Sequence, residues 1–267
     1  MSRPWLTQTR AGILILAFVV VTAVAVGAFG FSALTLGIPS VVFLALLTDG
    51  VARPGSGILY PTVTRGTRDS RHVALTFDDG PDPEVTPAVM DALARYGARA
   101  TFFSIGRLLK EHPQLARRLV AAGHELGNHS WRHSRWQNLF GAKEHTREIA
   151  RGERAIASLT GCRVKPLYRP PIGLKSPQLA RVASRRQLTL VAWSLHSRDT
   201  RTADPKRIAR HVLERIHPGD IVLMHDGHDQ PGRHRPACAK AVRMILWGLR
   251  RKGLQCVTVS ELLNLPR

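Results

Sequence analysis

Cysteine is scarce in this 267-residue sequence, and its scarcity limits the possible fold classes. The cysteines are three in number, they lie far apart, and none belongs to a C-x-x-C pair; they are Cys162, Cys238 and Cys256. A fold held by many disulfides and a cysteine-based zinc site are therefore both excluded. We expect these cysteines to be small buried residues or residues without a particular role. A hydrophobic content of 44% is normal for a globular protein with an ordinary core.

Acidic residues are also few, since 19 Asp and Glu stand against 39 Lys and Arg, which gives a formal net charge of +20. Such an excess favours a polyanionic neighbour, for example an anionic membrane surface, an acidic glycan, a lipid phosphate or nucleic acid. A general preference of the source proteome for arginine would explain the excess equally well. No basic run alternates with aromatic residues as in nucleic-acid-binding modules, so we expect no nucleic-acid partner.

Charged side chains are missing altogether from Ala11 to Thr48. A membrane-spanning helix needs about 20 apolar residues, so this stretch is too long for one comfortable span. Glycine and proline breaks near its middle predict two short spans, over about 11–29 and 31–47, in a membrane anchor that covers residues 1–48. A signal peptide is the alternative interpretation, but its apolar region is only about 7–15 residues long.

Arginines flank this anchor on both sides, at Arg3 and Arg10 before it and at Arg53 and Arg65 after it. Two spans with basic flanks would place both ends in the cytoplasm under the positive-inside rule. One long tilted span would instead place the following domain outside. The sequence therefore predicts an integral membrane protein and leaves open the side on which the rest of the chain lies.

Residues 49–71 are rich in Gly, Pro and Arg and are predicted to form a linker. One domain is predicted over residues 72–260, with a tail at 261–267. Within the domain, apolar stretches of strand length alternate with helical patterns, which indicates a parallel sheet, either open or closed into a barrel. The expected strands are 73–77, 100–104, 124–128, 166–169, 189–194, 221–224 and 255–259, and the expected helices are 86–96, 113–122, 143–159, 205–216 and 237–252.

The first of these strands ends in two adjacent carboxylates, Asp78 and Asp79, which Gly80 and Pro81 follow. Glycine permits a sharp turn and proline cannot continue a sheet ladder, so both carboxylates lie at the end of the strand. Two carboxylates this close repel each other unless a cation or a shared proton separates their roles. We therefore predict that one of them binds a metal ion and that the other is a general base.

His129 and His133 offer two imidazole ligands for this metal, because a spacing of four residues puts both on one face of a helical turn. Together with Asp79 they give the one carboxylate and two imidazoles of a catalytic site that keeps positions open for water and substrate. Zn²⁺ is our first choice, although the set also accepts Co²⁺, Fe²⁺, Mn²⁺ or Ni²⁺. Asp78 then remains as the general base that activates the attacking water.

Five separated motifs occur along the chain, and in their order they resemble the polysaccharide deacetylases with a NodB homology domain, known as carbohydrate esterase family 4. The motifs are TFDDGP at 76–81, HSWRH at 129–133, RPPIG at 169–173, WSLHSRD at 193–199 and IVLMH at 221–225. The resemblance covers about residues 72–260. It implies a distorted seven-stranded (β/α) barrel, which would follow the predicted N-terminal transmembrane region, and it assigns Asp79, His129 and His133 as the metal ligands.

The resemblance also implies roles for residues of the later motifs. Arg169 is similar to the arginine that pairs with the catalytic base in the family, where a guanidinium keeps the carboxylate ionised. His225, which ends a continuous apolar run, is the implied general acid for the leaving amine. Such a histidine must be protonated at that step, and Asp199 is the candidate partner that raises its pKa. The predicted catalytic residues are thus Asp78, His225, Arg169 and Asp199.

Candidate substrate contacts are Pro170, Ile172 and Trp193, and the backbone N–H of Ile172 is a candidate donor to the oxyanion of the intermediate. The chain departs from the family pattern at Ile172, where an aromatic residue is frequent. It also departs at His196, where an acid is usual, and at Thr200, where tryptophan is usual. These departures remove stacking surface and put chitin and plain peptidoglycan strands in doubt as substrates.

The sequence therefore predicts a membrane-anchored, metal-dependent hydrolase that removes the N-acetyl group from an amino sugar in a surface or lipid-linked glycan. An O-deacetylase or a deformylase would use the same residues and is an open alternative. A non-catalytic glycan-binding membrane protein is the alternative from another class, although the complete set of catalytic residues argues against it.

Overall fold

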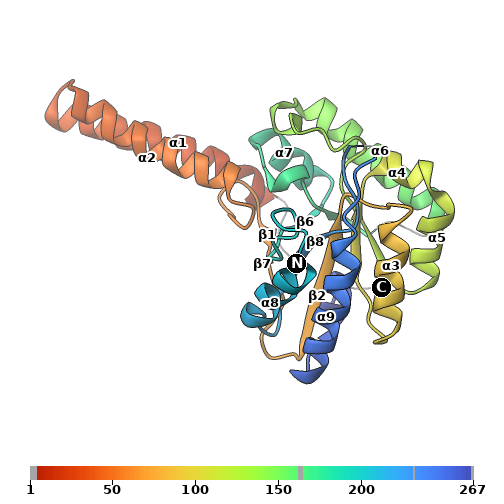
Figure 1. The fold of residues 1–267 in the computed structure, drawn as a ribbon. Coiled ribbons are helices and arrows are strands. Elements are labelled where there is room, and N and C mark those ends of the chain that lie inside the picture. The colour runs from red at the N-terminus through yellow and green to blue at the C-terminus, as the bar shows by residue number, and fades with distance from the viewer. Residues whose placement is uncertain (1–4, 162–164, 231, 266–267) are drawn as a thin grey trace.

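The chain forms two parts, an N-terminal helical hairpin and a domain of alternating strands and helices (Figure 1). The computed structural model describes residues 5–161, 165–230 and 232–265. The hairpin consists of α1 (Trp5–Phe29) and α2 (Ala33–Ala52), which lie side by side and project away from the domain. Ser32 caps α2, because its hydroxyl accepts a hydrogen bond from the Thr35 N–H.

The domain is built on one sheet whose ladders all run parallel, in the order β1-β6-β5-β4-β3-β2-β8-β7, with β9 paired to β2. Among the described residues the pairing does not close, so the sheet is a curled, open barrel. This confirms the predicted α/β fold of parallel strands. The strands are β1 (Thr62–Val63), β2 (His72–Asp78), β3 (Thr101–Ser104), β4 (Glu125–Asn128), β5 (Leu167–Tyr168), β6 (Thr189–Val191), β7 (Leu195–His196), β8 (Ile221–His225) and β9 (Gln255–Cys256). Two short strands, β1 and β7, were not predicted.

Helices connect the strands and cover the outer face of the sheet. Their bounds are α3 (Val85–Ala94), α4 (Gly106–Glu111), α5 (Pro113–Ala121), α6 (Ala142–Thr160), α7 (Pro177–Arg185), α8 (Pro205–Arg215), α9 (Ala237–Arg251) and α10 (Val259–Leu262), with short 3-10 turns at Gln137–Leu139 and Pro171–Gly173. The five predicted helices are present within a few residues of their predicted ends. The sequence analysis missed α4, α7 and α10, which are short.

Strand β2 shows how the barrel separates an apolar layer from a polar interior. Its odd-numbered residues Val73, Leu75 and Phe77 are fully buried in the main core, among side chains from α3, α8 and α9. Successive side chains of a strand point to opposite faces, so Thr76 and Asp78 point the other way, into the barrel. The interior of the barrel is therefore polar at the end of β2 where the two carboxylates lie.

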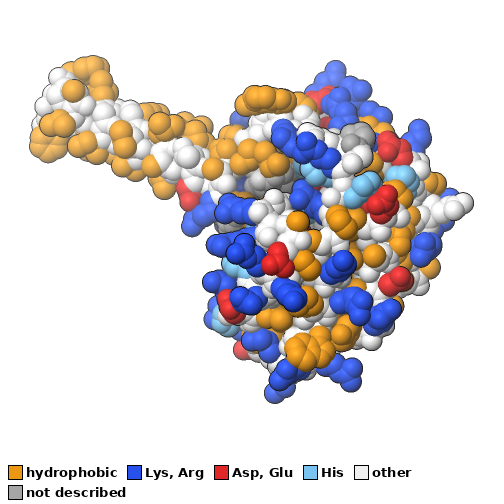
Figure 2. Space-filling view, viewed as in Figure 1, with side chains coloured by type: hydrophobic (Ala, Val, Ile, Leu, Met, Phe, Trp, Pro, Cys, Tyr) orange, Lys and Arg blue, Asp and Glu red, His pale blue; other side chains and the backbone are white. Residues whose placement is uncertain are grey.

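The hairpin has the length and composition of a membrane anchor. Residues Gly12–Phe29 and Ala33–Ala52 have mean hydropathies of 2.7 and 1.8, and Figure 2 shows hydrophobic side chains over the whole hairpin. The Phe18 and Phe43 rings lie 4.7 Å apart between the two helices. Length and composition alone fit a signal sequence as well, so the two helices are candidates for spanning a membrane.

The segment predicted as a linker, residues 49–71, is ordered and packed onto the domain. Leu59 and Tyr60 are buried in a second core cluster, which also receives Leu47 and Val51 from the end of α2. The Tyr60 hydroxyl donates to the Leu188 carbonyl, and β1 pairs with β6. The hairpin is therefore joined to the domain by packed side chains and a strand pair as well as by its covalent connection.

Candidate active site

The residues singled out in the sequence meet at the carboxyl ends of the parallel strands. Asp78 is the last residue of β2, and it lies opposite His225, the last residue of the neighbouring β8. Asn128 ends β4, and the Asn128 carbonyl accepts a hydrogen bond from the Arg169 N–H, just after β5. Parallel strands bring their carboxyl ends to one edge, which is where barrels of this kind place their sites.

Three side chains converge as the sequence predicts for a metal site. Asp79 Oδ1 lies 3.6 Å from His129 Nε2 and 3.3 Å from His133 Nε2, and all three side chains are buried. Their ligand atoms lie within 4.8 Å of one another. Asp79 Oδ1 has no hydrogen-bond partner among the described residues. A buried, unpartnered carboxylate oxygen facing two imidazole nitrogens fits a divalent metal ion.

The two histidines lie in an irregular loop, so the predicted helical turn is wrong. Ser130 and His133 have φ values of 67° and 55°, in the left-handed region, which a right-handed helical turn does not allow. Asn128 Oδ1 accepts from the Ser130 N–H at 2.9 Å, and Ser130 Oγ accepts from the His133 N–H at 3.0 Å. These side-chain bonds shape the loop and bring both imidazoles to the same point.

Each imidazole has its own neighbour on the side away from Asp79. His129 Nδ1 lies 2.7 Å from the Arg169 carbonyl, which can only accept, so Nδ1 carries the proton and Nε2 offers a lone pair. Burial lowers the pKa of His129 to about 3, so its imidazole is neutral, as a metal ligand must be. His133 Nδ1 faces Asp229 Oδ2 at 3.7 Å, which is beyond hydrogen-bond distance. The sequence analysis missed Asp229.

Asp78 is held by a guanidinium inside the barrel. The Arg169 side chain is completely buried, and its Nη1 donates to Asp78 Oδ1 at 2.6 Å and to Thr76 Oγ1 at 2.8 Å. Its Nε and Nη2 donate to carbonyls of residues 191 and 192. The guanidinium also lies 4.1 Å from the centre of the Phe103 ring. These contacts hold the Arg169 guanidinium in place, and it in turn fixes the orientation of the Asp78 carboxylate.

His225 is paired with Asp199. Its Nδ1 lies 2.9 Å from Asp199 Oδ1, and its backbone N–H donates to Asp199 Oδ2 at 2.7 Å. Burial alone lowers the pKa of His225, but the charge of Asp199 and its hydrogen bond outweigh burial and raise the pKa to about 9. The structure thus gives His225 a protonated imidazole at neutral pH, with Nε2 as its remaining donor.

A short loop over Pro170–Gly173, here called the substrate loop, borders the site. Ile172 is 51% exposed and has a φ of 49°, and a Cβ added at Gly173 would lie 2.8 Å from the Trp193 ring. Trp193 is half-buried, and Arg169 lies 5.7 Å from its ring centre. The three predicted substrate contacts, Pro170, Ile172 and Trp193, therefore lie together beside Arg169.

His196 is a further residue near His225. It stands where an acid was expected from the family pattern, and its ring centre lies 6.1 Å from that of His225 and 6.2 Å from that of Trp193. Burial lowers the pKa of His196, more than Asp199 raises it. A neutral imidazole thus takes the place of a negative charge beside His225.

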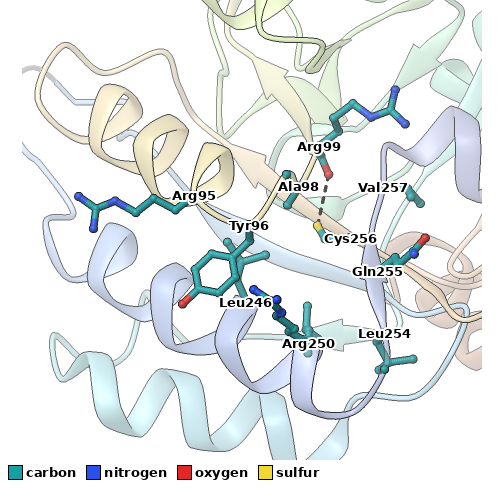
Figure 3. A pocket seen from close by; sticks show the side chains of 13 residues that line it. Arg95, Tyr96, Ala98, Arg99, Leu246, Arg250, Leu254, Gln255, Cys256 and Val257 are labelled. Atoms are coloured by element: carbon teal, nitrogen blue, oxygen red, sulfur yellow. Dashed lines mark hydrogen bonds between the residues drawn. The ribbon is translucent and has the colours of Figure 1, made fainter.

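One hollow in the described part of the chain lies away from these residues. It measures about 600 Å³ and is lined by residues 95–99, which follow α3, by α9 and by β9, with Arg95, Arg99 and Arg250 among its side chains (Figure 3). Because β9 pairs with the first residues of β2, this hollow lies at the opposite end of the barrel from Asp78. Cys256 is buried in its wall and donates to the Arg99 carbonyl, and Cys238 is buried in the core, as expected for both. Cys162 lies outside the described residues.

Comparison with known proteins agrees with this geometry. A family model described as polysaccharide deacetylase matches residues 65–191. A peptidoglycan-N-acetylglucosamine deacetylase of Bacillus cereus is 37% identical over 194 residues, which are 72% of this chain and 88% of that protein. A chitooligosaccharide deacetylase of Azorhizobium caulinodans is 36% identical over 163 residues, 61% of this chain and 77% of that protein. The crystal structure of the Bc1960 peptidoglycan N-acetylglucosamine deacetylase superposes with a TM-score of 0.71 at 30% identity and covers 76% of this chain and 92% of that one.

Proposed function

We propose that this chain, which belongs to the polysaccharide deacetylase family and is a hydrolase of amide bonds in N-acetylated glycans, deacetylates an amino sugar in a surface or lipid-linked glycan. In this reaction Asp78 is the base and His225 is the acid. One observation carries the proposal. The Asp79–His129–His133 cluster, the Asp78–Arg169 pair and the His225–Asp199 pair lie at one end of the barrel, on neighbouring strands.

The first of these groups would hold one divalent metal ion, and Zn²⁺ is the ion that its donor atoms favour, with Co²⁺, Fe²⁺, Mn²⁺ or Ni²⁺ as the other choices. A divalent ion at such a site supplies Lewis acidity, which lowers the pKa of water and polarises a carbonyl oxygen. Support for its presence comes from the unpartnered Asp79 Oδ1 and from the neutral His129.

The protein's own side chains then move the protons of the reaction. Asp78 accepts a proton from the water that attacks the acetyl carbonyl, and Arg169 keeps the Asp78 carboxylate oriented for this step. His225 donates its proton to the amide nitrogen as the C–N bond breaks, so acetate and a free amine leave. Asp199 positions the His225 imidazole and stabilises its protonated form. The Ile172 N–H, at the edge of the site, is a donor for the oxyanion of the intermediate.

Three features favour a surface or lipid-linked glycan as the substrate. The apolar hairpin would hold the domain at a membrane, as an integral membrane protein. The net charge of +20 suits phosphate or carboxylate groups near the sugar. The substrate loop carries Ile172 at a position where members of the family were expected to carry an aromatic residue. A long sugar chain that binds by stacking therefore gains less binding energy there.

Acetate release by the full-length chain in detergent tests the proposal. The panel holds N-acetylglucosamine oligomers, peptidoglycan fragments and a polyprenyl-linked N-acetyl sugar, each with a chelator and after metal add-back. We expect metal-dependent release that falls about 10²–10⁴-fold in Asp78→Asn, the usual contribution of a general base. The exposed Asp91→Asn is the matched control. Release that persists in Asp78→Asn would contradict the assignment of the base, and a soluble oligomer far better than the lipid-linked sugar would contradict the substrate.

A further inference from the structure

A second buried cation, Lys175, lies between the hairpin and the substrate loop. Its residue is 1% exposed, and its ammonium donates to the carbonyl oxygens of Arg53, Pro54 and Ser56 at 3.1, 2.7 and 2.7 Å. Its backbone N–H donates to the Val51 carbonyl at 3.1 Å. Among the described residues no carboxylate lies within ion-pair distance of its Nζ, and the charge that raises its pKa against burial is the more distant Asp49. A buried ammonium held by neutral carbonyls is unusual, because burial of a charge normally requires an opposite charge.

All of these acceptors belong to one short segment, residues 51–56, which follows directly from the end of α2. A lysine ammonium has three protons, and the three carbonyls use all of them. Burial lowers the pKa of Lys175 to about 8, so the ammonium form still predominates at neutral pH. Lys175 therefore fixes the path of the backbone where the hairpin enters the domain.

The same segment forms the wall behind the substrate loop. Gly173 packs closely against Pro54 and Trp193, because an added Cβ would lie 2.8 Å from the side chain of each. Its φ of 73° also favours glycine. Lys175 follows Gly173 by two residues, so the bonds of Lys175 hold the end of the substrate loop against the wall that residues 51–56 provide.

The hairpin is seated on this wall by its own contacts. Arg10 Nη1 donates to the Gly57 carbonyl at 2.7 Å, and α1 lies alongside α7, the helix that begins just after Lys175. Leu47 and Val51 of α2 pack into the core cluster that contains Leu59. A displacement of the hairpin would therefore also move the substrate loop, because packed groups connect the two.

We propose that Lys175 is a positioning residue for the deacetylation, which couples the seating of the N-terminal hairpin to the position of the substrate loop. The proposal rests on the role in substrate binding proposed above for this loop. Lys175 touches neither the metal-ligand cluster nor the proton-transfer residues, so its contribution is to the binding of the sugar. A mutation that removes binding shared by ground state and transition state raises KM and leaves kcat unchanged.

The test compares Lys175→Met with Tyr60→Phe in the full-length chain in detergent, because Lys175 acts through residues that a truncated domain would lack. Methionine keeps the apolar stem and removes the ammonium. Tyr60→Phe removes one hydrogen bond of the same interface, to Leu188, without touching the substrate loop. With N-acetylglucosamine oligomers, we expect Lys175→Met to raise KM about tenfold with little change in kcat or bound zinc, and Tyr60→Phe to change neither.

Amide hydrogen exchange of residues 172–176 provides a readout that does not depend on activity. The N–H groups of Gly173, Leu174 and Lys175 are hydrogen-bonded to residues 170, 171 and 51, so they are protected in the native chain. Lys175→Met should speed their exchange at least about tenfold, whereas Tyr60→Phe should not. This result holds even if the panel of glycans contains no substrate, so failure of the proposed function would be recognised separately.

Two outcomes would overturn the proposal. The first is an unchanged KM and unchanged exchange in Lys175→Met. The second is a rise in KM in Tyr60→Phe that equals the rise in Lys175→Met, when both variants lose the same amount of thermal stability. That result would show that Lys175 has a purely structural role. If Lys175→Met does not fold, Pro54→Ala replaces it, because alanine keeps the carbonyl that Lys175 binds and removes the ring that contacts Gly173. Unchanged KM and exchange in Pro54→Ala would then overturn the coupling.

Discussion

Two buried basic side chains in neighbouring regions, Arg169 and Lys175, are held by different means. In the barrel interior, Arg169 faces a carboxylate, Asp78, and also donates to Thr76 Oγ1 and to two backbone carbonyls. At the junction with the hairpin, Lys175 donates to backbone carbonyls. The first arrangement fixes the orientation of the Asp78 side chain, the proposed general base. The second fixes the course of a backbone, so under the proposed function the two regions separate the chemistry from the positioning of the substrate.

The largest expected effect comes from breaking the charge balance in the barrel. Arg169→Met leaves the Asp78 carboxylate buried without its partner, which costs about 3–5 kcal/mol of folding stability. Lys175→Met leaves only neutral carbonyls without a donor and should cost about 1–3 kcal/mol. Denaturant unfolding of the full-length chain in detergent with a chelator, followed by circular dichroism, measures both free energies.

A double variant sharpens this difference. Asp78→Asn in the Arg169→Met background removes the unpaired charge and should recover part of the lost stability, because the cost lies in the unpaired carboxylate. No such partner substitution exists for Lys175, because its three nearest acceptors are backbone carbonyls. A Lys175→Met variant as unstable as Arg169→Met would show that the two cations do not differ in kind.

A second prediction concerns the proton donor and its dependence on pH. His225 acts in its protonated form, so kcat/KM should fall as the pH rises through its pKa of about 9. In Asp199→Asn, burial acts on His225 against only the charges of Asp79 and Asp78, so the pKa should fall to near or below the ordinary histidine value of about 6.5. At pH 8 the variant should therefore lose at least about tenfold in kcat/KM, and part of this loss should return on acidification.

A pH–rate profile of both chains measures this shift, and His217→Asn, at an exposed histidine, is the control. If the fall of kcat/KM at alkaline pH occurs at the same pH in Asp199→Asn as in the native chain, the proton donor is a group other than His225.

The His225–Asp199 pair also makes the free energy of unfolding depend on pH, in a direction that can be predicted. Because the folded pKa of His225 is raised, its contribution is fully present below about pH 6.5 and is lost as the pH rises through about 9.

Metal affinity should respond more weakly to Asp229, which faces His133 Nδ1 at 3.7 Å. Carboxylates behind a metal-binding histidine orient its ring, and their removal usually costs about 10–100-fold in metal affinity. Because Asp229 lies 3.7 Å from His133 Nδ1, we expect Asp229→Asn to lower the metal affinity by about tenfold, at the lower end of this range. Competition with a zinc chelator measures the affinity, and Asp91→Asn controls for the loss of one negative charge. An unchanged affinity would mean that the Asp229 carboxylate serves its contacts with Arg135 and His228 and does not orient His133.

Most residues of the candidate site could be predicted from the sequence, because the ends of the strands and the order of the motifs mark their positions. Asp78 and His225 each end a strand whose apolar pattern is clear, and the parallel sheet brings such ends together. The pairing of Arg169 with Asp78 and of Asp199 with His225 follows the expectation from the family resemblance. The catalytic, metal-binding and substrate-binding roles of these residues stay predictions until the variants are measured.

The features that the sequence did not reveal are those in which tertiary contacts override local patterns. A spacing of four residues suggested a helical turn, but bonds from Asn128 and Ser130 hold His129 and His133 in a loop. The two-residue strand β1 is too short to show a periodic pattern. A lysine is usually exposed, so nothing marked Lys175 as buried. The Ser176–Pro177 start of α7 was a usable signal, since Ser176 caps that helix.

The smallest expected effect comes from Ile172, where the two regions meet. A β-branched residue with a φ of 49° is uncommon, and its side chain offers no flat face to a sugar. Ile172→Tyr should gain about 0.5–1 kcal/mol from ring contacts and lower KM for N-acetylglucosamine oligomers about two- to fivefold. Ile172→Leu, which removes the β-branch without adding a ring, is the control. In the Lys175→Met background the gain should vanish, because a ring contributes only where the substrate loop is held in place.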